Sequence, residues 1–505
     1  MRASALRRVA AGFVLLLSVP AGAQRADLRL VDAVRHGDRQ AVSTLLRAGI
    51  DVNARQPDGA TALHWAAYRD ALDTADLLLG AGARPDAANE LGVTPLYLAC
   101  ENGSAALVRR LLAAGAAPNA TLRGGETALM TAARTGSVGA VTALLDHGAD
   151  VHARETKEGQ TALMWAVSQR HPAVVRALLE AGADVRARSR VRPVATASSP
   201  RTGAAEGVTV IDEGGFTPLL FAARQGDLAS ARLLLAAGAD PNDTAPSGTS
   251  ALVVAAHSGH GELAARLLDQ GADPNAAGAG YAALHAAVLR GDADLVGALL
   301  AHGADPHARL QNGSPHARYG KFFALEMRLT GATPLFLAAK YARADIMRRL
   351  AAAGADPRAR LAGGVTPLMA AAGMLTPGFV QAGNDRRGRA IDTAEMELAL
   401  SQDPDRRRLM NSGIDAVQAA VALGADVDAA NDDGDTALHL AAHHGFNSVV
   451  RYLVGQGADL HMRNARGQTP LDRALGLTGR VPARNPLTDT DIGTADLLRA
   501  LGASE

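Results

Sequence analysis

The residues that could do chemistry in this sequence are few. His443 and His444 are adjacent and could contact a metal ion together, but zinc needs further ligands that nothing near them supplies. Cys100 is the single cysteine, so an intramolecular disulfide and a thiolate metal cluster are both excluded. We therefore expect neither a metal site nor a disulfide.

Catalytic and cofactor motifs are also absent from the sequence. No His-Glu-x-x-His, Cys-x-x-Cys, Gly-x-Ser-x-Gly, phosphate-loop or kinase pattern occurs anywhere in the 505 residues. We expect no catalytic residue and no cofactor, and therefore no enzyme. The one segment that could still hold a site without a known motif is an insertion at about 373–412.

A targeting signal begins the sequence. Three arginines among the first eight residues precede an apolar run over residues 9–19, and small residues then lead to Gln24. This order is typical of a secretory signal peptide, and the apolar run is too short to span a membrane. We expect residues 1–23 to be removed and the protein to be exported, either to the periplasm or beyond the cell, without a transmembrane segment.

Net charge and composition narrow the classes of partner and of fold. The 51 basic and 51 acidic residues cancel, and loss of the leader leaves a formal charge of −3, so nothing draws the whole chain to nucleic acid. The chain is 48% hydrophobic but only 3% aromatic. Because bulky aromatic side chains normally fill large cores, this composition favours many small packing units.

One unit of about 33 residues recurs along the chain. A Gly-x-Thr-(Pro/Ala)-Leu segment marks the unit, and its Thr position falls at Thr61, Thr94, Thr127, Thr161, Thr217, Ser250, Ala282, Thr333, Thr366, Thr436 and Thr469. Successive positions are 33, 33, 34, 56, 33, 32, 51, 33, 70 and 33 residues apart. This spacing indicates a repeated structural unit that is interrupted by three insertions.

Each unit predicts two short helices joined by turns. Its Thr caps the first helix, and a following proline such as Pro95 suits the first helical position. Leu63, Ala66 and Ala67 then form one apolar stripe. A polar pair, a second helix and Gly-Ala-Asp follow, and the glycine ends the second helix before a turn leads to the next unit.

This pattern resembles the ankyrin repeat, in which Gly-x-Thr-Pro-Leu-His-x-Ala-Ala, Val-Val-x-x-Leu-Leu and Gly-Ala-Asp-Val-Asn-Ala segments follow one another. Good copies run from Gly59 to Ala67 and from Gly434 to His439, and the resemblance covers almost all of residues 27–505. It implies an all-α ankyrin-repeat solenoid of about 12 helix-turn-helix repeats, with β-hairpin-like fingers and three insertions.

Some conspicuous side chains are expected to be structural. The resemblance implies hydrogen bonds within and between turns for the histidine of the Leu-His position, here His64, His285 and His439. Trp65, Trp165 and Phe221 share another repeat position, and we expect them to fill gaps between repeats.

The period divides the chain into parts. These are a signal peptide (1–23), an N-terminal capping repeat (24–56), ankyrin repeats (57–190, 214–312 and 331–466), insertions (191–213, 313–330 and about 373–412) and a C-terminal capping repeat (467–505). The first insertion is rich in Pro, Ser and Thr and predicts a disordered finger extension. The second is an aromatic and basic finger, and the third predicts a charged, solvated lobe between the two helices of one repeat.

A binding face follows from the period, because the polar pair after Ala-Ala ends the first helix on the concave side that the family uses for partners. The candidate contacts are Tyr68, Arg69, Glu101, Asn102, Arg134, Arg224, Gln225, His257, Arg290, Lys340, Tyr341, His443 and His444, with Tyr319, Phe322 and Phe323 of the second insertion. We call Arg69, Arg134, Arg224, Arg290 and Lys340 the basic ladder. We expect it to pair with carboxylates of a partner, the alternative being ordinary solvated helix ends.

The sequence thus predicts a monomeric, non-catalytic scaffold that binds a partner protein of unknown identity on its concave face. The alternative is a secreted effector or adhesin that acts on a host or neighbouring cell, because the same export signal permits both.

Overall fold

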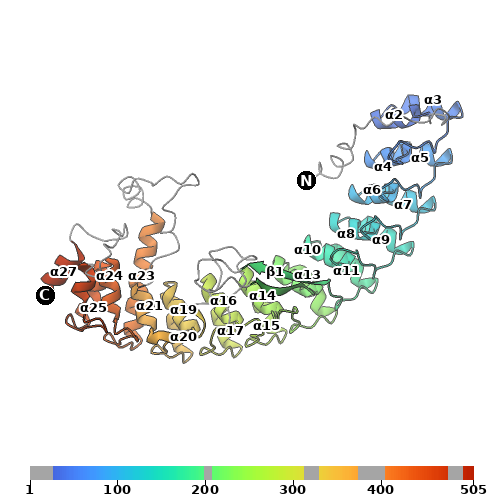
Figure 1. Ribbon diagram of the computed structural model, residues 1–505. Coiled ribbons are helices and arrows are strands. Elements are labelled where there is room, and N and C mark those ends of the chain that lie inside the picture. Colours follow the sequence, from blue (N-terminus) through green and yellow to red (C-terminus); the bar gives the residue numbers. More distant parts are fainter. Residues whose placement is uncertain (1–26, 198–207, 312–328, 374–403, 476–492, 505) are drawn as a thin grey trace. The chain divides into compact units, whose positions relative to one another are not determined.

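The protein is a series of short helix pairs. The computed structural model describes residues 27–197, 208–311, 329–373, 404–475 and 493–504, so the predicted leader lies outside the described residues. Within the described residues, 24 helices form twelve pairs, which confirms the predicted all-α solenoid. The chain divides into two compact units, Met1–Ala153 and Arg154–Glu505, and within each unit the pairs follow one another in chain order (Figure 1).

The first unit contains four helix pairs in its described part. Their bounds are α2 (Arg29–His36) with α3 (Arg39–Arg47), α4 (Ala62–Tyr68) with α5 (Leu72–Gly80), α6 (Pro95–Glu101) with α7 (Ala105–Ala113), and α8 (Ala128–Thr135) with α9 (Val138–Asp146). First helices pack on first helices, and second helices pack on second helices.

The second unit contains eight helix pairs and one two-stranded sheet among its described residues. The elements are α10 (Ala162–Ser168), α11 (Pro172–Glu180), β1 (Val191–Ala197), β2 (Val208–Gly214), α12 (Pro218–Gln225), α13 (Leu228–Ala236), α14 (Ala251–Ser258), α15 (Gly261–Asp269), α16 (Ala283–Arg290), α17 (Ala293–Ala301), α19 (Pro334–Lys340), α20 (Ala344–Ala352), the 3-10 helix η4 (Ala362–Gly364), α21 (Pro367–Gly373), α23 (Pro404–Ala422), α24 (Ala437–His444), α25 (Asn447–Gly455), α26 (Pro470–Leu475) and α27 (Thr494–Ala500). The same first-on-first and second-on-second packing runs through this unit.

Local sequence explains where each first helix begins. The hydroxyl of Thr94 accepts a hydrogen bond from the backbone N–H of Tyr97, and Thr217 and Thr333 accept in the same way from the residue three positions on. Proline follows each of these three threonines and costs no backbone bond at the first helical position. The repeated Thr-Pro pair therefore sets the start of a helix in repeat after repeat.

Alanine lets neighbouring helices approach closely. Ala66 and Ala67 of α4 are fully buried, as are the equivalent Ala222 and Ala223 of α12. A side chain this small leaves room for a thin core, which is then filled mainly by leucine and valine of the adjacent helices. The low aromatic content of the chain follows from this packing.

Arginines at the base of the fingers tie each repeat to the next. In the second unit Arg154 donates to the carbonyl oxygen of Arg188 at 2.5 Å, Arg309 to that of Arg360 at 3.5 Å, and Arg360 to that of Ala430 at 3.1 Å. Donor and acceptor occupy the same position in successive repeats, although 51 and 70 residues separate the last two pairs. The insertions therefore leave this inter-repeat bond in place.

The first insertion corrects a prediction. Residues 191–213 were expected to be disordered, yet β1 and β2 form an antiparallel hairpin in which Val191 lies opposite Gly214 and Ala197 opposite Val208. The β-branched run over residues 208–211 favours a strand, and Pro193 is tolerated because a two-stranded sheet has only edge strands. Residues 198–207 lie outside the described residues.

The third insertion runs into helix α23, the second helix of this repeat. α23 begins at Pro404 and has 19 residues, whereas the preceding second helix α20 has nine, so the first part of α23 lies within the predicted insertion at about 373–412. The helix packs on α20, α21 and α25. The insertion does lie between the two helices of one repeat, as expected. Most of the aromatic insertion at 313–330 lies outside the described residues.

Candidate functional site

In four of the predicted polar pairs the second residue reaches back to the preceding repeat. In the first unit Arg69 donates to a carbonyl oxygen at the end of α2 (3.1 Å), Asn102 to two at the end of α4 (2.9 and 3.0 Å) and Thr135 to one at the end of α6 (3.1 Å). In the second unit Arg290 donates through Nε to the carbonyl oxygen of His257 in α14 at 2.6 Å. These side chains bind carbonyl groups that have no partner within their own helix.

The first residue of each pair lies on the open side of the first unit. The Tyr68 side chain is exposed, and its ring stands edge-on to that of Trp65 at 5.8 Å. Glu101 and Arg134 of successive repeats form an ion pair at 3.6 Å, and both side chains are about one third exposed. Exposed pairs of this kind add little to stability, so their position is compatible with a contact surface.

In the second unit the same position is more varied. The guanidinium of Arg224 is exposed and lies over the rings of Phe216 and Phe221 at 5.5 and 5.2 Å, while Gln225 beside it is half-buried. The Lys340 ammonium lies 5.6 Å from the ring of Tyr341, which is the next residue.

One predicted contact residue is not on the surface. The His257 side chain is fully buried, and its ring packs 5.7 Å from that of Tyr281. The prediction that His257 belongs to a binding face is therefore wrong, because Tyr281 covers that position.

His443 and His444 end α24 in half-buried positions. Their ring centroids are 5.1 Å apart, and His444 stacks on Phe446 at 5.6 Å. Burial lowers the pKa of His443, and burial together with the neighbouring His443 lowers the pKa of His444 to about 4. Both rings are therefore neutral at pH 7. Across the described ranges, no group of three His, Cys, Asp or Glu side chains is placed to hold a metal ion.

The histidines of the Leu-His position bond as the resemblance implied. Nδ1 of His285 accepts the backbone N–H of Ala282 at 3.2 Å, so Nε2 carries the proton and donates to the carbonyl oxygen of Ala308 at 3.1 Å. His64 and His439 make the same two kinds of bond. Burial lowers the pKa of His285 to about 4 and also lowers the pKa values of the other two. These residues are structural.

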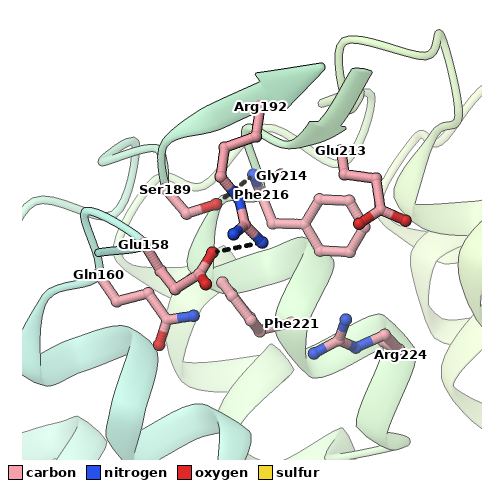
Figure 2. A pocket seen from close by; sticks show the side chains of 9 residues that line it. All are labelled: Glu158, Gln160, Ser189, Arg192, Glu213, Gly214, Phe216, Phe221 and Arg224. Atoms are coloured by element: carbon pink, nitrogen blue, oxygen red, sulfur yellow. Dashed lines mark hydrogen bonds and ion pairs between the residues drawn. The ribbon is translucent and has the colours of Figure 1, made fainter. Parts of the chain in front are cut away.

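A partly open hollow lies beneath the β1–β2 hairpin. It is a cavity of about 130 Å³ in the second unit. Its lining comprises Glu158, Gln160, Ser189, Arg192, Glu213, Gly214, Phe216, Phe221 and Arg224. Figure 2 shows Arg192 and Glu213 on the hairpin strands, with Phe221 and Arg224 of α12 facing them. Two aromatic rings and four charged groups of alternating sign therefore meet in one small cleft.

Specific backbone bonds hold the walls of this cleft. The carboxylate of Glu155 is buried and accepts backbone N–H groups of Lys157, Glu158 and Gln160 at 2.7 to 3.0 Å, which fixes one wall. Glu158 then pairs with Arg192 of β1 at 3.1 Å. The finger turn and the hairpin are therefore linked by an ion pair across the cleft, as the dashed line in Figure 2 shows.

The hairpin leaves the repeat at a position that only glycine can occupy. Gly214 has a φ of +96°, and a Cβ there would lie 1.9 Å from the carbonyl oxygen of Arg190. Beside it, Phe216 donates its backbone N–H to the hydroxyl of Ser189 at 3.0 Å, and Ser189 donates its own N–H to the carbonyl oxygen of Phe216 at 3.0 Å. Phe216 is thereby held under the hairpin, where its ring meets Arg224.

The structure also shows the surroundings of the conspicuous aromatic side chains and of the single cysteine. Phe221 is buried but lines the cleft rather than only filling a gap between repeats, and Trp65 donates from Nε1 to Oε1 of Gln56 at 2.8 Å. Cys100 is fully buried, and burial raises the pKa of its thiol above the usual range. Three predicted contacts lie outside the described residues: Tyr319, Phe322 and Phe323.

The comparisons with known proteins agree with this architecture. Models of three consecutive ankyrin repeats match residues 30–122, 104–189, 219–309 and 409–489, and a single-repeat model matches residues 330–360. Together these matches cover well over half of the chain. The chain belongs to the ankyrin repeat family. Ankyrin repeats generally mediate protein–protein interaction, and proteins built from them are typically non-enzymatic scaffolds.

Two relatives show how far the similarity reaches. Neurogenic locus notch homolog protein 1 of Homo sapiens is 35% identical over 142 residues, which are 28% of this chain and 5% of that protein. Protein PhlB of Serratia liquefaciens is 41% identical over 104 residues, which are 20% of this chain and 41% of PhlB. The chain therefore spans less than half the length of either relative.

None of the helices in the described residues is both long and apolar enough to cross a membrane.

Sequence reasoning missed most of the cleft. Glu158, Arg192, Glu213 and Phe216 were not among the predicted contacts, although Arg224 was. A signal was available, because the first insertion ends at residue 213, four positions before the Thr217 cap of the helix that carries Arg224. The Pro, Ser and Thr content of the insertion predicted disorder, so the insertion contributed no predicted contact.

Proposed function

We propose that this ankyrin repeat protein is a non-catalytic scaffold that binds a partner protein on the first-helix side of its repeats. The observation that carries this proposal is the cleft beneath the β1–β2 hairpin. It places carboxylates and guanidinium groups over two buried aromatic rings, and Arg is among the residue types that dominate binding energy at protein interfaces.

The partner is proposed to present an acidic segment. The first-helix ends carry the basic ladder, of which Arg69 and Arg290 are held by carbonyl groups and Arg224 by two aromatic rings. A guanidinium already held in place loses little conformational freedom when a carboxylate binds to it. The lack of catalytic motifs supports a binding role, and the predicted leader supports export.

Deletion of residues 191–213 gives a sharp test. It shortens the long interval between Thr161 and Thr217 from 56 residues to the period of 33, so the repeats keep their normal spacing. We expect the variant to retain its helix content and to lose partner capture. A photoreactive residue at Gln160, which lines the cleft, should cross-link the same partner in the native compartment.

The matched control places the photoreactive residue at Arg176 on the second helix α11, where the side chain is exposed and remote from the first-helix ends. Equal cross-linking at both positions, or a partner retained after the deletion, would contradict the proposed binding face.

Cell fractionation tests the proposed export. Retention in the periplasm supports an exported scaffold, and release into the medium supports the effector or adhesin alternative. Full-length protein found in the cytoplasm with residues 1–23 intact would contradict both.

A further inference from the structure

Cationic side chains of the second unit lie one repeat away from where the sequence places them. The guanidinium of Arg290, which ends α16, lies at the end of α14, where it bonds to the carbonyl oxygen of His257. The guanidinium of Arg343, which precedes α20, lies against Gly291 at the end of α16. Each side chain therefore adds its charge to the preceding first helix.

These displaced arginines close the gaps in the predicted ladder. Arg170 follows α10, Arg224 lies in the last turn of α12, and Lys340 ends α19. A cationic residue is thus associated with the C-terminal end of each first helix from α10 to α19, by chain position for Arg170, Arg224 and Lys340 and by the place of the guanidinium for Arg290 and Arg343. We call Arg170, Arg224, Arg290, Arg343 and Lys340 the basic row. His260 lies among them, and its pKa is lowered by burial first and then by Arg170 and Arg290.

Acidic residues of the same turns belong to the second helices. Asp227 caps α13 by accepting the backbone N–H of Ser230, and Asp292 caps α17 by accepting that of Leu295. Asp294 pairs at 3.7 Å with Arg349 of α20. These three carboxylates therefore serve the second helices, whereas Glu158 and Glu213 line the cleft beside Arg224.

The spacing of the basic row matches an extended polypeptide. Packed helices lie about 8 to 10 Å apart, and α10, α12, α14, α16 and α19 pack one on the next. An extended chain advances about 3.3 Å per residue, and a polyproline II helix advances about 3.1 Å with three residues per turn. Every third side chain of such a segment therefore advances by one repeat and points to the same side.

We propose that the basic row binds an acidic segment of the partner in an extended, polyproline II-like conformation, with a carboxylate at every third residue opposite successive repeats. This inference rests on the proposed function of protein binding and adds the register of the bound segment. The positive charges of the basic row favour carboxylates in the bound segment. The distance between successive repeats favours an interval of three residues between those carboxylates.

The test compares two synthetic peptides of thirteen residues and equal composition. One has glutamate at positions 1, 4, 7, 10 and 13 between prolines and alanines, and the other has its five glutamates in one block. Fluorescence anisotropy with the mature protein at physiological ionic strength measures the two dissociation constants. We expect the periodic peptide to bind about tenfold more tightly. Its five glutamates can all lie opposite the basic row, whereas the block of the other peptide can place only two or three of its glutamates there.

Charge reversal identifies the surface that the peptide occupies. Arg170→Glu and Arg343→Glu lie at exposed positions of the row, and together they should weaken the periodic peptide by about 30-fold or more. Arg176→Glu and Arg232→Glu, on the exposed second helices α11 and α13, change the net charge equally and should leave binding within about twofold. Circular dichroism melts of all variants show that the fold is retained.

The outcomes separate this inference from the function on which it rests. Equal binding of both peptides, weakened by Arg170→Glu and Arg343→Glu, would overturn the register and leave an acidic partner at this face. Binding of neither peptide, or equal loss in the second-helix control, would overturn the basic row as a binding site. Partner capture through the cleft is measured separately by the deletion of residues 191–213.

Discussion

The first-helix ends of the two units have the same structural task and meet it with different chemistry. In the first unit Arg69 binds the preceding helix end through its guanidinium, whereas Asn102 and Thr135 do so through neutral amide and hydroxyl groups. In the second unit the ends of α14 and α16 receive the guanidinium groups of Arg290 and Arg343. Because neutral donors are sufficient at two helix ends of the first unit, the positive charges of the second unit are not required for stacking, which agrees with the surface role proposed for them.

The largest loss of stability should come from replacing the buried histidine of the Leu-His position, which both units contain. His285→Leu leaves the backbone N–H of Ala282 and the carbonyl oxygen of Ala308 buried without partners, which should cost about 4 kcal/mol of local stability. His64→Leu in the first unit should cost a similar amount. Hydrogen exchange measures both, with the exposed His302→Leu as a control expected to stay within about 0.5 kcal/mol.

A fall in pH should lower the stability of the second unit more than that of the first. Because burial lowers the pKa of His285 to about 4, the unfolded chain takes up the proton first as the pH falls. The contribution of neutral, buried His285 to the free energy of unfolding is therefore complete above about pH 6.5. It decreases toward pH 4, by up to about 3 kcal/mol. The described part of the first unit has one histidine with a lowered pKa, His64, whereas the second has several.

Hydrogen exchange between pH 7 and pH 4 would measure this difference unit by unit. Equal loss of protection in both units would show that the histidines with lowered pKa values do not control acid stability.

Removing single caps should separate stability from binding. Asn102→Ala and Arg290→Ala each release helix-end carbonyl groups and should cost about 1 kcal/mol of local stability. Arg290→Gln keeps a donor but removes the charge, so it should recover part of that stability while the periodic acidic peptide still binds weakly. Full recovery of peptide binding by Arg290→Gln would mean that charge at this position does not matter.

The smallest effect concerns three turns that lack the usual glycine. Asp70, Arg170 and Ala342 have positive φ values of 56°, 60° and 54° where other repeats have glycine. Ala342→Gly should stabilise the second unit by about 0.5 to 1 kcal/mol, because alanine is strained in this conformation. Asp70→Gly in the first unit should gain less, since aspartate tolerates the left-handed region better. Thermal melts of the two variants rank these gains.

Much of the fold could be predicted from short sequence patterns. The Thr-Pro caps, the buried alanines and the bonds of His64, His285 and His439 all depend on residues within a few positions of one another or on the turn that leads to the next repeat. The hairpin was missed because its Pro, Ser and Thr content outweighed the β-branched run at 208–211. The cleft was missed with it, since Glu158 and Arg192 meet only when the hairpin pairs.

The sequence by itself determined the repeated unit, its helix starts and the thin alanine core, because these depend on local backbone preferences and on a fixed period. Only the tertiary structure decided which helix end each cation serves. Arginine side chains are long enough to reach the neighbouring repeat, so the charge of Arg290 lies at α14 rather than at α16, and His257, predicted on the surface, is covered by Tyr281. Surface charge in a solenoid is thus set by side-chain reach between repeats, which residue order alone does not reveal.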